Sequence, residues 1–173
     1  MDRLISIFCG ILIILASSLV FPGKSLAVSS SQIGALPLVK NIFAGNTPDN
    51  LGVNDGRLPS CPDSPNCVVS QNADTNHSIA PIAYDTDLAT ARETLLKVLR
   101  VVPRTQIVEQ TDNYIYARSE SRLMGFIDDL EFYFPEDEQV IHLRSASRLG
   151  ESDLGVNRRR LEQIRLAFND LKA

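Results

Sequence analysis

The feature that most constrains the fold is a change of hydrophobic period along the chain. Residues 105–148 alternate apolar and polar side chains in four stretches, and turn signals divide the first pair at 111–113 and the second pair at 135–138. Such alternation predicts strands, and short connections between consecutive strands favour an antiparallel meander. Helical spacing flanks this region, over residues 85–102 and 157–173. We therefore predict an α+β domain with two helices on one face of a four-stranded antiparallel sheet.

Each helical stretch carries one apolar stripe and a start signal. The first stripe consists of Leu88, Ala91, Leu95, Val98, Leu99 and Val102. Asp85 or Thr86 is expected to cap this helix, and Pro103 is expected to end it. The second stripe consists of Leu161, Ile164, Ala167, Phe168 and Leu171, and Asn157 or Asp153 is the expected cap.

Alternation also assigns the acidic residues of the third strand to faces. Asp129 and Glu131 share one face, and the other face carries the apolar residues Leu130, Phe132 and Phe134. Packing apolar side chains together across the hairpin places Arg144 opposite Asp129 or Glu131. Asp128 points away from Asp129, at the start of the strand, where it can accept backbone or arginine hydrogen bonds. The second sheet face is therefore predicted to carry arginines, carboxylates and tyrosines.

That polar face has three interpretations. The first is a solvated surface whose ion pairs contribute little to stability. The second is a platform for an anionic ligand or a protein partner, which suits a chain with 13 Arg and 4 Lys. The third is a catalytic or metal site built on Asp128, Asp129 and Glu131. The opposite orientations of the two aspartates weaken this third interpretation, because only one of them can join Glu131.

The stretch from 144 to 160, "RSASRLGESDLGVNRRR", offers a similar choice. Arg144, Arg148 and Arg158 can converge with Asp153 near the N-terminus of the last helix, a position favourable to anions. Alternatively, Arg148 and Asp153 brace the connection between strand and helix.

Two cysteines, Cys61 and Cys67, lie in "CPDSPNC", where two prolines help the chain to turn. We expect a disulfide between them, in keeping with an exported chain. A zinc site is the alternative, but it needs two more ligands, and the only histidines are His77 and His142. We predict neither a metal nor a cofactor.

The N-terminus has the pattern of a targeting segment. Arg3 precedes the apolar run 4–21, and Pro22-Gly23 leads to a small-residue site after Ala27. We expect cleavage after Ala27; the alternative is an uncleaved anchor, which is then the chain's only membrane contact. Residues 28–60 are predicted to be an arm or linker, and residues 61–173 a single domain. The net charge of −4 argues against nucleic-acid binding.

Three blocks together resemble the domain of unknown function 1499 family: "LGVNDGRLPSCPDSPNCVVSQ", "GFIDDLEF" and "RSASRLGESDLGVNRRRLEQIR". The resemblance runs from about Pro48 to Leu171, with Val69 where the family pattern has serine. Members occur in bacteria, including cyanobacteria, and in chloroplasts, which implies a periplasmic or thylakoid-lumen setting. The family has no agreed activity. Its motifs single out Asp128, Asp129, Glu131, Arg144, Arg148, Asp153, Asn157 and Arg158.

From these observations we expect an exported, non-catalytic protein. It would bind a protein partner or a small anionic ligand through the arginine-carboxylate face, in the upkeep of a membrane complex. The alternative function is a metal-dependent or acid-base hydrolase that uses Asp128, Asp129 and Glu131.

Overall fold

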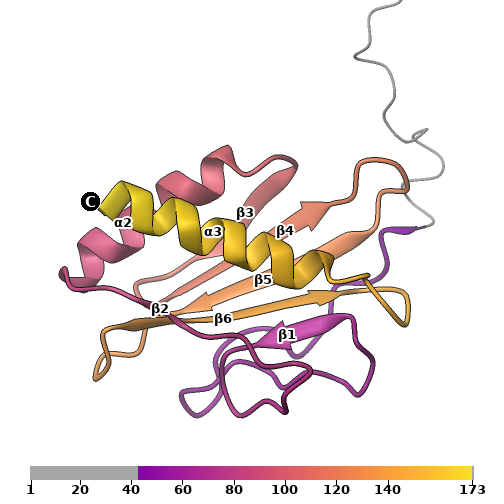
Figure 1. The fold of residues 1–173 in the computed structure, drawn as a ribbon, viewed down its shortest axis with the longest axis horizontal. Coiled ribbons are helices and arrows are strands. Elements are labelled where there is room, and N and C mark those ends of the chain that lie inside the picture. Colours follow the sequence, from indigo (N-terminus) through magenta and orange to yellow (C-terminus); the bar gives the residue numbers. More distant parts are fainter. Residues whose placement is uncertain (1–42, 173) are drawn as a thin grey trace, which may run out of the picture. The chain divides into compact units, whose positions relative to one another are not determined.

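The computed structural model describes residues 43–172, in which two helices pack on an antiparallel sheet of six strands (Figure 1). The elements are β1 (Cys67–Val69), β2 (Ile82–Ala83), α2 (Leu88–Val101), β3 (Thr105–Gln110), β4 (Tyr114–Glu120), β5 (Ile127–Tyr133), β6 (Val140–Ser147) and α3 (Val156–Lys172). The strand order is β1-β6-β5-β4-β3, and β2 also pairs with β6. The predicted α+β class and the meander β3 to β6 are therefore confirmed.

The prediction of four strands was wrong, because β1 and β2 extend the sheet. β1 pairs with Arg144–Ala146 of β6, and β2 pairs with Val140–Ile141 of the same strand. They have three and two residues, which is too short for a period of two to be recognised in a sequence. These two segments become strands because they pair with the free edge of β6, and their own sequences show no strand pattern.

Helix α2 begins one or two residues later than predicted. Asp87, and not Asp85 or Thr86, is the N-cap, and its carboxylate accepts a hydrogen bond from the backbone N–H of Thr90 at 2.9 Å. The helix ends just before Pro103. Its predicted apolar stripe is confirmed, since Ala91, Leu95, Val98 and Leu99 are buried and Leu88 and Val102 pack partly buried against them.

Helix α3 lies across the sheet in Figure 1. Leu161, Ile164 and Phe168 are buried in the same core as the stripe of α2. Leu171 was expected to join this stripe, but its side chain is 57% exposed, so the buried stripe stops at Phe168. The core between helices and sheet is completed by Ile115, Ala117, Leu130, Phe132, Ile141 and Leu143.

The opposite sheet face carries a second, smaller apolar cluster. It consists of Leu58, Val69, Tyr114 and Tyr116, with Leu51 and Cys61 partly buried against them. The arm therefore packs on the sheet in its residues 51–58. A tight turn at Asn54–Arg57 reverses the arm, with two backbone hydrogen bonds of 2.9 and 3.0 Å and positive φ at Asp55 and Gly56.

The predicted disulfide is present, with 2.07 Å between the sulfurs of Cys61 and Cys67. It closes the loop that leads from the arm into β1. Between residues 43 and 172 there is no helix long and apolar enough to span a membrane. The predicted targeting segment, residues 1–27, and the first part of the arm, residues 28–42, lie outside the described residues.

Candidate functional site

Glu131 and Arg144 meet on the sheet face away from the helices, as alternation predicts. They lie directly opposite each other in the register of β5 and β6, and Arg144 Nη1 donates to Glu131 Oε2 at 2.8 Å. The other carboxylate oxygen, Oε1, accepts from the Tyr114 hydroxyl at 2.9 Å and from the Gly52 backbone N–H at 2.7 Å. Three donors from separate parts of the chain therefore hold Glu131.

Asp129 is held in a similar way by Arg148, the residue after β6. Arg148 Nε donates to Oδ2 at 2.9 Å, and Nη2 donates to Oδ1 at 2.8 Å. The Tyr116 hydroxyl donates to Oδ1 at 2.6 Å and accepts from Arg148 Nη2 at 3.0 Å. A guanidinium that meets a carboxylate with two parallel bonds is one of the stronger charge-assisted pairs. Asp129 and Glu131 thus each accept hydrogen bonds from one arginine and one tyrosine.

Burial sets the protonation of the two tyrosines. It raises the pKa of Tyr114 far above its usual value, and the charge of Glu131 raises it further. The pKa of Tyr116 is raised to about 12, first by burial and then by the hydrogen bond to Asp129. The hydrogen bond to Asp129 also raises the pKa of the Arg148 guanidinium. Both hydroxyls therefore remain hydrogen-bond donors across the physiological pH range.

Asp129, Glu131, Arg144 and Arg148 form a buried ion-pair network. The relative exposures of Glu131, Asp129 and Arg144 are 0%, 1% and 4%, and the Arg148 side chain is 6% exposed. The arm and the second apolar cluster cover the network. The part of the polar face around these four residues, predicted to be a solvated surface or an open platform, is therefore interior. Among the described side chains, Arg144 Nε is the one buried polar atom without a hydrogen-bond partner.

Asp128 lies on the helix side of the sheet, separate from the network, as alternation predicts. Its carboxylate accepts from the Ser147 hydroxyl at 2.5 Å and pairs with Arg160 Nη2 at 2.8 Å. The Ser147 hydroxyl in turn accepts from Asn157 Nδ2 at 3.0 Å. The expected hydrogen bonds to Asp128 are thus present, and they join the start of β5 to the first turns of α3.

Asn157 is fully buried at the start of α3 and serves as a junction. Its Nδ2 donates to the carbonyl oxygen of Asn66 at 2.9 Å, and its Oδ1 accepts from the Ser145 hydroxyl at 2.5 Å. Arg160 Nη1 also donates to Oδ1, at 3.1 Å. Asn157 therefore links the residue before β1, the strand β6 and the helix, a structural role that accounts for its place in the motif.

Asp153 and Arg158 have separate structural partners. The carboxylate of Asp153 accepts from the backbone N–H of Gly155 at 2.9 Å and of Asn157 at 2.6 Å, so it caps α3 as predicted. Arg158 donates to two carbonyl oxygens in the loop between β1 and β2, at 2.6 and 2.8 Å. The predicted convergence of three arginines with Asp153 is not present, since Arg144 and Arg148 belong to the buried network.

The two histidines make hydrogen bonds within the protein. His77 Nδ1 lies 2.6 Å from Asp74 Oδ2, and this hydrogen bond raises the pKa of His77. His142 Nδ1 lies 3.1 Å from the Ser70 hydroxyl, and burial lowers the pKa of His142. Within residues 43–172, no three His, Cys, Asp or Glu side chains are grouped as a metal site would require.

Sequence reasoning overlooked Arg160 and Gly52 as partners of the acidic residues. Arg160 could have been found, because residues three apart are neighbours on a helix, which places Arg160 beside Asn157. It also directly precedes Leu161, a residue of the buried stripe. Gly52 could not have been found, because every residue except proline has a backbone N–H, and the sequence does not show which of them donates to a distant side chain. Its contact with Glu131 spans 79 positions of the chain.

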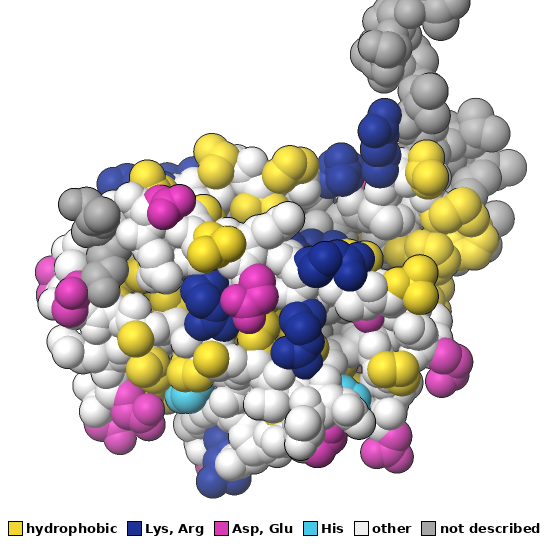
Figure 2. Space-filling view, in the orientation of Figure 1, with side chains coloured by type: hydrophobic (Ala, Val, Ile, Leu, Met, Phe, Trp, Pro, Cys, Tyr) yellow, Lys and Arg dark blue, Asp and Glu magenta, His cyan; other side chains and the backbone are white. Residues whose placement is uncertain are grey.

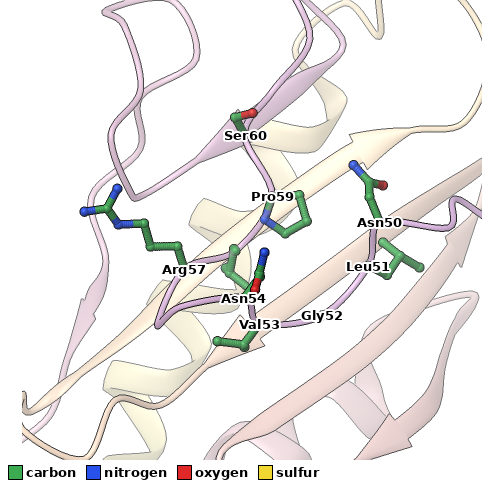
Figure 3. Close-up of a pocket in the computed structure, with 9 residues that line it drawn as sticks. Asn50, Leu51, Gly52, Val53, Asn54, Arg57, Pro59 and Ser60 are labelled. Atoms are coloured by element: carbon green, nitrogen blue, oxygen red, sulfur yellow. The ribbon is translucent and has the colours of Figure 1, made fainter.

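Open hollows adjoin the arm that covers the network. Two of them, of about 430 and 410 Å³, share Leu51, Gly52 and Val53 in their walls. Figure 3 shows the first, lined by the turn at residues 50–60, with the Arg57 side chain extending away from Pro59. Each has a single charged residue in its wall, Arg57 in the first and Glu109 in the second. Neither hollow gathers charge of one sign.

A third hollow, called the arginine hollow below, has a volume of about 270 Å³. Its walls consist of Ala44, Arg104, Gln106, Arg118, Glu120, Gly125, Ile127 and Arg148. Arg118 Nη2 and Nε donate to the side-chain oxygen of Gln106 at 2.8 and 3.2 Å, and Arg104 Nε donates to the carbonyl oxygen of Glu120 at 3.1 Å. This is the part of the polar sheet face that stays open, and it adjoins the buried network through Arg148.

A family model described as "Protein of unknown function (DUF1499)" matches residues 57–168. The chain belongs to the DUF1499 family. The matched region contains the disulfide, all six strands and the eight motif residues singled out in the sequence. A search among curated proteins finds no match. DUF1499 membership accounts for the motifs, and the family description names no reaction.

Proposed function

We propose that this DUF1499 protein is a non-catalytic binding protein that takes a carboxylate or phosphate group of a small ligand into the arginine hollow. The observation that supports this proposal is the meeting of three arginines, Arg104, Arg118 and Arg148, with one carboxylate, Glu120, in one open hollow beside a sealed ion-pair network. Planar guanidinium groups suit carboxylate and phosphate, because they donate two parallel hydrogen bonds.

The two outer arginines supply the recognition. Arg118 is exposed and donates to a neutral amide oxygen of Gln106, which an anionic oxygen can replace with a stronger, charge-assisted bond. Arg104 has a positive φ of 55°, a backbone strain of the kind that gathers at functional sites. Arg148 is already bound to Asp129, so it positions the inner wall and leaves recognition to the other two.

The hydrolase alternative has less support. A general acid or base must come within hydrogen-bond reach of the substrate. Asp129 and Glu131 are 1% and 0% exposed and are occupied by arginine and tyrosine donors, and Asp128 is 5% exposed and occupied by Arg160 and Ser147. Binding at the open arginine hollow requires no rearrangement of these contacts.

Thermal unfolding of the full chain in detergent tests the binding proposal. Inorganic phosphate or citrate is added at an ionic strength matched with sodium chloride. An anion at a hundredfold excess over Kd should stabilise the folded state by roughly 2.7 kcal/mol. The double variant Arg104→Gln/Arg118→Gln should lose this stabilisation. The matched control Arg100→Gln, which removes an exposed arginine on α2, should retain it.

Equal stabilisation of all three proteins would refute the arginine hollow as the binding site, because it would reflect a general effect of the anion on protein surfaces. No stabilisation by either anion would count equally against the proposal.

The cellular setting is part of the same proposal and rests on residues 1–27. We propose export to the periplasm or thylakoid lumen, with a partner protein presenting the anion as an alternative to a free ligand. Mass spectrometry of the protein isolated from membranes and from the soluble extract tests the export step. A mature N-terminus at Val28 supports cleavage, whereas retention of Met1 in the membrane fraction supports an anchor.

A further inference from the structure

Two adjacent loops at one end of the molecule expose large apolar side chains to solvent. Five of the ten exposed large hydrophobic residues within 43–172 lie in these loops or directly after them: Leu123 (63%), Met124 (40%), Leu149 (41%), Leu154 (82%) and Val156 (38%). The β4–β5 loop carries the first two, the β6–α3 loop carries Leu149 and Leu154, and Val156 is the first residue of α3. We call these five residues the apolar end.

The two loops meet around a shared apolar hollow of about 210 Å³, lined by Ser121, Phe126, Asp128, Ser147, Leu149, Gly150, Ser152, Asp153, Leu154 and Val156. The β4–β5 loop is closed at its base by a hydrogen bond from Ser121 N–H to the Phe126 carbonyl oxygen at 2.8 Å, so residues 122–125 form its tip. Exposed leucines on a structured tip form a surface that water solvates poorly.

Leu154 is an unusual choice for its position. Among residues 43–172 it is the most exposed large hydrophobic residue, and its φ of 53° falls in the left-handed region that favours glycine or asparagine. The loop nevertheless holds it in place, since Arg159 Nη1 donates to its carbonyl oxygen at 2.8 Å. A polar residue would suit both the backbone and the solvent better, which suggests that the apolar side chain has an interaction outside the domain.

The first described residues, from Phe43 on, pack at this same end. Phe43 packs on Phe126 with ring centroids 5.1 Å apart, and a Cβ added at Gly45 would lie 3.0 Å from Leu149 Cγ. Figure 1 shows the first described residues beside the β4–β5 and β6–α3 connections, and Figure 2 shows apolar side chains gathered at that end. Residues 22–42 then connect Phe43 to the apolar run 4–21 over at most ~70 Å of extended chain.

We propose that the apolar end lies against a lipid bilayer, with Leu123 and Leu154 in its interfacial layer. In the uncleaved chain, the apolar run 4–21 is long enough to enter a bilayer, and residues 22–42 connect it to Phe43, which packs beside these loops. Arg122 is exposed at the tip of the first loop, and its positive charge attracts lipid phosphates. Glu151 is exposed in the second loop, and its negative charge opposes that attraction. Apolar contact is therefore the main source of attraction. The inference does not depend on anion binding in the arginine hollow.

The absence of tryptophan from the chain gives a direct test. Single variants Leu123→Trp, Leu154→Trp and Leu166→Trp of the full chain are reconstituted into phosphatidylcholine and phosphatidylglycerol vesicles. Leu166 on α3 is the matched control, with 62% exposure against 63% for Leu123. Quenching by lipids with doxyl groups near the headgroup is then measured. Tryptophans at 123 and 154 should lose emission roughly twofold or more and shift to the blue, whereas tryptophan at 166 should do neither, because interfacial burial is only ~5–10 Å deep.

Three results would overturn the proposal. Equal quenching at all three positions would mean that the domain has no preferred orientation on the membrane. No quenching at 123 and 154 would place the apolar end in water. A blue shift at 123 and 154 that depends on protein concentration but not on doxyl lipid would identify a second copy of the chain as the partner.

Discussion

The pair of Glu131 and Arg144 gives the sharpest test of the fold, because both charges are buried and face each other at 2.8 Å. We consider three proteins: Glu131→Gln, Arg144→Met and the double variant. Each single change leaves one ion without its counterion in a site that is at most 4% exposed. Removal of one partner of a buried pair costs about 3–5 kcal/mol.

The double variant should cost much less than the sum of the two single variants. The glutamine introduced in place of Glu131 retains an oxygen that can accept from the Tyr114 hydroxyl and the Gly52 N–H, and the methionine is compatible with the apolar cluster around the site. Loss of Arg144 also removes the buried Nε that has no hydrogen-bond partner, an arrangement that costs about 1–3 kcal/mol in the native protein. We therefore expect a coupling energy of at least ~2 kcal/mol between the two positions.

Urea unfolding of the full chain in detergent, followed by far-UV circular dichroism, measures these free energies. With a slope of ~2 kcal/mol per molar urea, each single variant should unfold about 2 M earlier than the native protein. The control Arg118→Met removes an arginine from the exposed end of the same face, and its change should stay within about 0.5 kcal/mol. Single-variant losses below ~1 kcal/mol that simply add in the double variant would refute a buried, coupled pair.

Three further predictions concern other parts of the fold. Replacing Cys61 and Cys67 together by serine should cost about 2 kcal/mol of stability, because the small loop they close is then unconstrained in the unfolded chain. In urea unfolding, a reductant should lower the free energy of unfolding of the native protein by the same amount and leave that of the variant unchanged. Asn157→Ala should lower the free energy of unfolding by about 2–4 kcal/mol, since it leaves partners on β6 and at Asn66, the residue before β1, unsatisfied; a loss like that of an exposed site would contradict the junction role. The hydrogen bond to Asp74 raises the pKa of His77, so its stabilisation is complete below the unfolded pKa near 6.5 and declines as pH rises through the higher folded value; the difference in Tm between native protein and His77→Gln should shrink from roughly pH 6 to pH 8, and a constant difference would count against the ion pair.

The sequence predicted the faces of β4, β5 and β6 correctly because a strand has a period of two. Once Leu130 and Phe132 are assigned to the core, Asp129 and Glu131 must point to the other side, and pairing then brings Arg144 to them. The same reasoning placed Asp128 on the helix side, where Arg160 meets it. These results depend only on local geometry and on one pairing between neighbouring strands.

The sequence did not predict that the part of this face around Asp129 and Glu131 is interior. Charged side chains indicate solvent in most sheets, and the arm that covers them has no regular pattern of its own. Its contacts are backbone groups and a few apolar side chains, such as the Gly52 N–H on Glu131 and Leu58 in the second cluster. The strands β1 and β2 were missed for a related reason, since both form by pairing with β6, which is far from them in the sequence.

The sequence alone thus determined the α+β class, both helices, the central hairpins, the disulfide and the DUF1499 family. Only the tertiary structure decided that Asp129 and Glu131 are sealed from solvent and that the open arginines are Arg104 and Arg118. It also decided that the exposed leucines of two loops lie at the end of the domain where Phe43 packs on Phe126. The physical reason is that alternation and periodicity specify which way a side chain points within its own element. Burial depends on which distant segment packs over that element.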